Sequence, residues 1–269
     1  MMTISTRDWL AYINKLRKIN DEAANVMRDY LEKNMATASP QEMIDYAYMV
    51  AQKYSEGSAT LAAMMYDEIA ALEGVVTEAA ELAALPSYGD VAKTVNGIRK
   101  FSDNVDLIAE GVARLVKQTA VDTTMQNALR DGAEWAWIPH GDTCAFCIAL
   151  ASRGWQVASR KALKNGHAEH IHANCDCTYA IRFSDATDVA GYDPDEYYNM
   201  YLAGGNEGYE NKKMSHPEGR YASNKNINGM RRMFYKQNKE RINAQKRDAY
   251  AKRKELESDK ATETNVGAT

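Results

Sequence analysis

Cysteine and histidine side chains gather in one short window of the sequence. Between two short apolar stretches lie all four cysteines and four of the five histidines. They are His140, Cys144, Cys147, His167, His170, His172, Cys175 and Cys177. Thiolates and imidazoles are the side chains that bind Zn²⁺ in tetrahedral sites. The window therefore predicts a zinc site.

The spacing of these residues narrows the choice of ligands. Cys144 and Cys147 are separated by two residues, a gap that lets both thiolates reach one ion from a tight turn, and His172, Cys175 and Cys177 follow 24 or more positions downstream. Five candidates compete for four positions, and we favour Cys144, Cys147 and Cys175 with either His172 or Cys177. Such a closed shell leaves no place for a substrate. It predicts a structural Zn²⁺ that joins the two flanking strands, and no catalytic residue.

Four other interpretations of the window stay open. A redox Cys-x-x-Cys pair would leave the second cysteine pair unexplained. Disulfides are favoured in secreted proteins, and the N-terminal MMTISTRDWL has no signal-peptide pattern. A zinc-dependent hydrolase or nucleobase deaminase would use His167 and Glu169 as its H-x-E element, although that element precedes the cysteines in deaminases and follows them here. The fourth is a zinc-stabilised nucleic-acid-binding module.

The elements expected around this window are mostly helices. Residues 134–138 and 178–183 alternate with period two and predict strands on either side of it. Capping patterns at Ser5 and at Ser39 predict helix starts, Gly57 and Ser58 are a possible interruption, and Leu85-Pro86 ends the next stretch. Ser87 starts another helix, and a long one is expected over 103–131.

The first helix carries apolar residues at 4-3-4-3 spacing, a pattern typical of a helix packed lengthwise on a partner. Two asparagines, Asn20 and Asn34, interrupt this seam.

The sequence as a whole predicts an α+β protein with four parts. These are a helical N-terminal region (1–131), a zinc-stapled module containing strands (132–190), a basic helical C-terminal arm (191–258) and a disordered tail (259–269).

The window resembles the Mu F-like phage minor head proteins, also called head-morphogenesis or minor capsid proteins. The resemblance rests on Trp137, on 142–147 (DTCAFC), on 150–155 (LASRGW) and on 172–178 (HANCDCT), and it covers roughly residues 130–185. Many relatives have arginine where this chain has Asp176, so any contact of that arginine is in doubt. The resemblance implies a non-catalytic role in the procapsid near the portal, in head assembly, DNA packaging or delivery. Portal, major capsid or scaffold proteins are the implied partners, and the virion or procapsid, made in the host cytoplasm, is the implied location.

Charge is distributed unevenly along the 269 residues. Residues 1–211 carry a net charge of −12, whereas residues 212–254 carry 14 basic and 3 acidic side chains, a net charge of +11. No run of 18 apolar residues occurs, so we expect no membrane span. The basic arm could neutralise DNA phosphates or meet an acidic protein surface. Its candidate DNA-binding residues are Arg231, Arg232, Lys236, Lys239, Arg241, Lys246 and Arg247.

Overall fold

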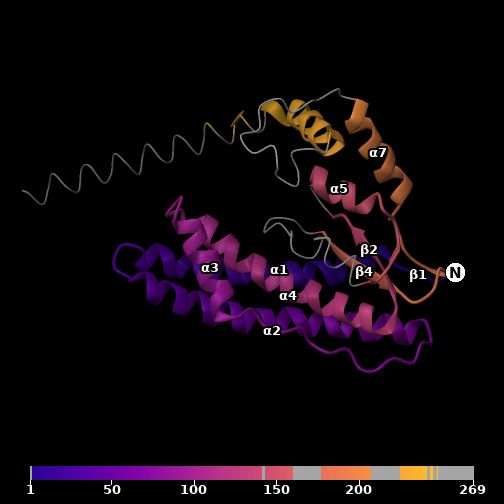
Figure 1. Cartoon of the computed structure of the whole chain (residues 1–269), viewed down its shortest axis with the longest axis horizontal. Helices are drawn as coiled ribbons and strands as arrows, with labels where there is room; N and C mark the ends of the chain where they lie inside the picture. Colours follow the sequence, from indigo (N-terminus) through magenta and orange to yellow (C-terminus); the bar gives the residue numbers. More distant parts are fainter. Residues whose placement is uncertain are drawn as a thin grey trace, which may run out of the picture. The chain divides into compact units, whose positions relative to one another are not determined.

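A computed structural model describes residues 2–140, 143–159, 177–206 and 225–240, together with 243, 244 and 247. The chain divides into two compact units, Met1–Tyr198 and Asn199–Thr269. In the first unit, long helices and a few short strands confirm the expected mostly helical α+β class (Figure 1). The tail at 259–269 lies outside the described residues.

The first two helices start where their capping residues predict. Helix α1 (Thr6–Asn34) begins after Ser5, whose hydroxyl accepts a hydrogen bond from the Asp8 N–H at 3.1 Å. Helix α2 (Pro40–Leu72) begins with a full capping box: Ser39 Oγ accepts from the Glu42 N–H at 3.2 Å, and Glu42 Oε2 accepts from the Ser39 N–H at 2.7 Å. These bonds satisfy backbone groups that a helix start leaves without partners.

The expected interruption of α2 at Gly57 and Ser58 is wrong. The helix is continuous through both residues, and Ser58 and Ala59 are completely buried. A glycine inside a helix costs only about 1 kcal/mol relative to alanine, which burial of the surrounding apolar face outweighs.

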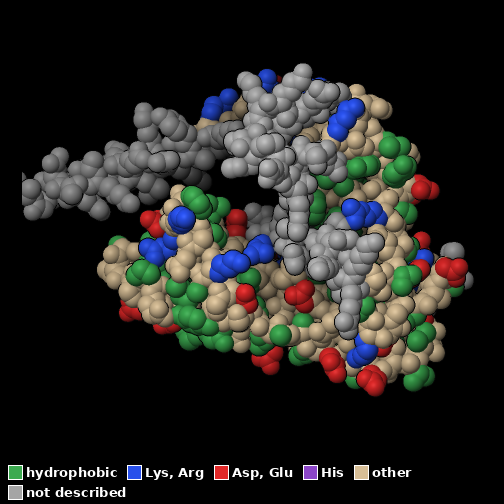
Figure 2. Space-filling view, in the orientation of Figure 1, with side chains coloured by type: hydrophobic (Ala, Val, Ile, Leu, Met, Phe, Trp, Pro, Cys, Tyr) green, Lys and Arg blue, Asp and Glu red, His purple; other side chains and the backbone are tan. Residues whose placement is uncertain are grey.

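The four long helices of the first unit form one bundle. Helices α1, α2 and α4 (Val105–Asp131) lie lengthwise against one another, and α3 (Tyr88–Arg99) packs on α2 and α4 (Figure 1). Met27, Leu31, Ala47, Val91 and Val112 lie in their shared core with less than 1% of their surface exposed. The predicted lengthwise seam of α1 therefore packs inside its own domain. On the face shown in Figure 2, acidic and basic side chains are interspersed with exposed apolar ones.

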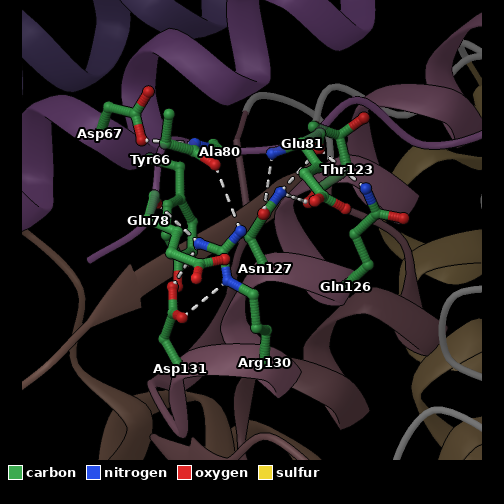
Figure 3. A network of polar contacts seen from close by, with 11 residues as sticks. Tyr66, Asp67, Glu78, Ala80, Glu81, Thr123, Gln126, Asn127, Arg130 and Asp131 are labelled. Carbon is green, nitrogen blue, oxygen red and sulfur yellow. Dashed lines mark hydrogen bonds and ion pairs between the residues drawn. The ribbon is translucent and has the colours of Figure 1, made fainter.

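An extended segment, residues 75–86, which we call the strap, connects α2 to α3 without regular secondary structure. Side chains of α4 satisfy its backbone (Figure 3). Asn127 accepts from the Glu81 N–H at 3.0 Å and donates to the Glu81 carbonyl at 2.8 Å, while Arg130 donates to the carbonyls of Glu78 and Ala79. The strap thereby obtains from side chains the hydrogen bonds that a helix or sheet supplies from backbone.

The strands form two small sheets. Strand β2 (Glu134–Ile138) is central and pairs antiparallel with β3 (Gln156–Val157) and β4 (Thr178–Arg182), which confirms both predicted strands. The N-terminal β1 (Met2–Ile4) pairs in parallel with β5 (Thr187–Val189), a long-range pairing that the sequence did not predict. This pairing brings the chain start to the residues that follow the cysteine window.

In the second unit, the end of helix α7 (Pro194–Asn206) packs against a helix at 225–240. A Cβ added to Gly204 would overlap the Asn226 carbonyl oxygen, and one added to Gly229 would overlap the Gly204 carbonyl. Ile227 and Met230 are buried. The first turns of the helix at 225–240 are therefore partly buried, because two glycines let the helices approach closely.

Candidate metal centre

The first cysteine pair is positioned by helix α5 (Ala145–Ala151), all of whose residues are buried. Cys144 caps this helix, and its Sγ accepts a hydrogen bond from the Cys147 N–H at 3.5 Å. The two Sγ atoms are also 3.5 Å apart. A disulfide requires about 2.05 Å, whereas two thiolates bound to one tetrahedral Zn²⁺ at about 2.3 Å are roughly 3.8 Å apart. The pair therefore fits two adjacent corners of a zinc tetrahedron.

Cys177 comes from the other side of the window, immediately before β4. It is completely buried, and its Sγ accepts a hydrogen bond from the His140 N–H at 3.4 Å. His140 follows β2, so the pairing of β2 with β4 sets the position of this thiol. Of the other candidate ligands, His172 and Cys175 lie outside the described residues, as do His167, Glu169 and His170.

Among the residues that the structure describes, no three His, Cys, Asp or Glu side chains form a group that could hold a metal ion. The structure thus brings Cys144 and Cys147 together and places Cys177 at the end of the β2–β4 pair. The zinc site and the competing redox, deaminase and nucleic-acid interpretations all stay predictions.

An aromatic cluster lies on the sheet beside the cysteine pair. The ring of Tyr179 on β4 packs edge-on against Trp135 and Trp137 of β2, with centroids 4.8 and 4.6 Å apart. Burial raises the pKa of Tyr179 far above its usual value, and the nearby Cys147 adds to the shift. The phenol therefore stays neutral, and the three rings pack together as part of the core of the module.

Arg182 links the strands of the module. Its guanidinium pairs with Glu134 at 2.7 Å, donates to the Thr187 carbonyl at 3.2 Å and stacks 4.6 Å from the Trp155 ring. The Trp155 indole in turn donates to Asp188 at 3.2 Å. Glu134 and Arg182 are direct partners in the β2–β4 register, so the two predicted strands contained the signal for this pair.

One link between the module and the bundle is a carboxylate at the end of α2. Glu73, the C-cap of α2, accepts hydrogen bonds from the Phe183 N–H and from the Ser184 hydroxyl, both at 3.0 Å. Sequence reasoning missed this residue, since a glutamate at a helix end carries no sign of a partner 110 positions away.

The predicted DNA-binding residues are only partly described. Arg231, Arg232, Lys236 and Lys239 are exposed on the helix at 225–240, and Arg247 is also exposed. Arg241 and Lys246 lie outside the described residues.

Comparison with known proteins identifies a matching family. A family model described as VG15 protein matches residues 3–204, which include the helical bundle, the strands and the cysteine window. No curated protein and no solved structure matches significantly. Of the described helices, none is both long and apolar enough to cross a membrane. Because the match covers about three quarters of the chain, this protein belongs to the VG15 protein family and is a phage-encoded protein.

Proposed function

We propose that the protein is a phage minor capsid protein, with a structural and interaction role at or near the portal in head assembly, DNA packaging or delivery. The family match over residues 3–204 carries this proposal, because it supports a phage origin for the segment that holds the minor-head-like motifs. The proposed partners are the portal and the major capsid or scaffold proteins. The proposed role requires no catalytic residue.

Mass spectrometry of purified procapsids and virions tests this proposal. We expect the protein at low copy in both particles, and defective heads when its gene is deleted from the phage. Particles that lack the protein, with normal heads in the deletion phage, would contradict the proposal. Deamination of cytosine or adenine that is lost in Glu169→Ala would replace it with the enzyme interpretation.

Within this role we propose that a structural Zn²⁺ holds the cysteine window together. Cys144 and Cys147 would supply two thiolates, and His172, Cys175 and Cys177 are the candidates for the other two positions. The 3.5 Å separation of the first two sulfur atoms supports the proposal. X-ray absorption at the zinc edge tests it, with a closed shell of sulfur, or of sulfur and one nitrogen, as the expected result. An exchangeable oxygen in the shell would contradict a purely structural ion.

We further propose that the basic arm contacts DNA during packaging or delivery. The net charge of +11 over 212–254 and the exposure of Arg231, Arg232, Lys236 and Lys239 support this. Each phosphate contact releases counterions, so the affinity should fall steeply with salt concentration. The charge reversal Lys239→Glu should weaken binding and lower the salt slope by about 1, whereas Lys53→Glu on α2 should not. Equal salt slopes for both variants would favour a protein partner.

A further inference from the structure

An open groove lies between the start of α1, the end of α2 and strand β1. Its volume is about 450 Å³. Trp9 and Tyr12 of α1 line one wall, Met64 and Leu72 of α2 line the other, and residues 3–5 complete it. Met64 is 63% exposed and Leu72 is 60% exposed. Large apolar side chains that are this exposed and share one groove mark an interaction surface.

The second feature of this surface is an unpaired strand edge. Among the described strands, β1 has one neighbour, β5. The Ile4 carbonyl accepts a hydrogen bond from the Ala190 N–H at 3.0 Å, so the backbone of Ile4 faces β5. Successive residues of a parallel strand turn their N–H and carbonyl groups to opposite edges, so those of the exposed Thr3 face away from β5. Such an edge is a template for a further strand.

The two walls of the groove carry opposite charges. Lys15 lies on the α1 wall and Glu68 on the α2 wall, and both side chains are exposed. Neither forms an ion pair with another residue in the described part of the chain. Each copy of the protein therefore presents one cation and one anion, on opposite walls, that do not pair with each other.

We propose that this groove is one half of a two-fold interface between two copies of the chain. A two-fold interface requires a patch that is complementary to itself. In the dimer, β1 of one copy pairs antiparallel with β1 of the other, and Thr3 supplies the backbone groups at the shared edge. Met64 and Leu72 of the two copies cover one another, and Lys15 of each copy meets the partner's Glu68.

A second copy fits this surface better than an unrelated peptide does. A basic segment would meet Lys15 and an acidic one would meet Glu68, so either would face a charge of its own sign. A second copy presents the same two charges in the reverse order. It also joins two β1–β5 sheets, each of two strands, into one larger sheet, and sheets of more than two strands are more stable.

Sedimentation velocity of the full chain across the micromolar range tests the proposal. We expect a monomer–dimer equilibrium for the wild type. Met64→Lys places a charge in the apolar groove and should raise the Kd of the dimer about 30-fold or more, the effect of losing one buried side chain. Met49→Lys is the matched control, because Met49 is 59% exposed on the same helix and does not line the groove. Its Kd should equal that of the wild type.

Exchanging the two charges tests whether the surface is complementary to itself. Lys15→Glu or Glu68→Lys alone places like charges opposite each other at both symmetric positions, and each should raise the Kd about 5-fold or more. The double variant restores an opposite pair at each position and should recover the wild-type Kd. Hydrogen exchange gives a separate readout, with slower exchange of the Thr3 amide as the wild-type concentration rises and no such slowing in Met64→Lys.

Three results would overturn the proposal. They are a wild type that sediments as a monomer throughout the range, a dimer whose Kd is the same in Met64→Lys, and a double charge variant that is as weak as the single ones. All of the substituted side chains are exposed, so the variants should keep the helical content of the wild type, which circular dichroism checks. None of these outcomes depends on the role proposed for the protein in the phage head.

Discussion

The helical bundle and the cysteine module are each stabilised in a different way. In the bundle, each helix start is capped by its own neighbouring residues, and a continuous core of apolar side chains joins the four helices. In the module, strands of two to five residues depend on contacts from distant parts of the chain, such as Arg182 with Trp155 and Glu73 with Ser184. The module therefore needs support from the rest of the chain, because strands this short bury too little surface to be stable alone.

The largest expected effect comes from removing the proposed zinc, which should affect the two regions differently. A chelator, or the variant Cys147→Ala, should unfold the module and leave the bundle helical, because structural zinc contributes about 10 kcal/mol or more to small domains. Hydrogen exchange should show loss of protection at 134–138 and 178–182 and retained protection in α2 and α4. Unchanged exchange in the module after metal removal would show that zinc does not support it.

A second change is directed at the bundle itself. Asn127 is 1% exposed and bonds both the N–H and the carbonyl of Glu81 in the strap. Asn127→Ala removes both part-buried hydrogen bonds to Glu81, leaves the Glu81 N–H without its partner, and should lower the free energy of unfolding by about 1–3 kcal/mol. Denaturant titration measures this loss. Gln126→Ala, which removes one exposed bond to the same carbonyl, is the matched control and should cost less than about 1 kcal/mol. Equal losses in the two variants would contradict a special role for Asn127.

A third change weakens the contact between the two regions. Glu73→Ala removes both hydrogen bonds between the end of α2 and the residues after β4. We expect a loss of about 1–2 kcal/mol, confined to the module, because hydrogen bonds to a charged group are stronger than neutral ones. Faster exchange of the Phe183 amide, with unchanged exchange in α4, is the expected signature. Glu81→Ala serves as the control, because only the backbone of Glu81 bonds to α4. Slower or unchanged exchange of the Phe183 amide in Glu73→Ala would contradict the proposed contact between the two regions.

The smallest expected effect depends on pH. A hydrogen bond from Arg130, together with one from Tyr66, lowers the pKa of Asp131 below its usual value. The stabilisation by this carboxylate is therefore present above the unfolded pKa of about 3.9 and is lost as the pH falls through the lower folded pKa. At neutral pH the free energy of unfolding of the wild type should exceed that of Asp131→Asn by about 1 kcal/mol. This difference should shrink as the pH falls below the unfolded pKa and through the lower folded pKa. Asp21→Asn, at an exposed position, is the control, and its free energy of unfolding relative to the wild type should not change with pH in this way. If the difference between the wild type and Asp131→Asn stayed constant with pH, it would contradict the pairing of Asp131 with Arg130.

Local sequence patterns predicted much of the bundle and little of what supports the module. The caps at Ser5, Ser39 and Ser87 were predicted correctly, because a cap and its partner lie within a few residues. Both strands beside the cysteine window were also predicted from their alternation. The break expected at Gly57 failed because burial of α2 outweighs a local preference.

The sequence by itself determined the helical class, the pairing of Cys144 with Cys147 in one turn, and the contrast between an acidic body and a basic arm. Only the tertiary structure decided that β1 pairs with β5, that Glu73 binds the residues after β4, that Gly204 meets Gly229 and that Met64 and Leu72 line a groove beside β1. The physical reason is how far apart in the chain the interacting residues lie. Capping, turn geometry and charge are properties of adjacent residues, whereas strand pairing, close helix approach and grooves between helices arise when segments far apart in the chain compete for the same space.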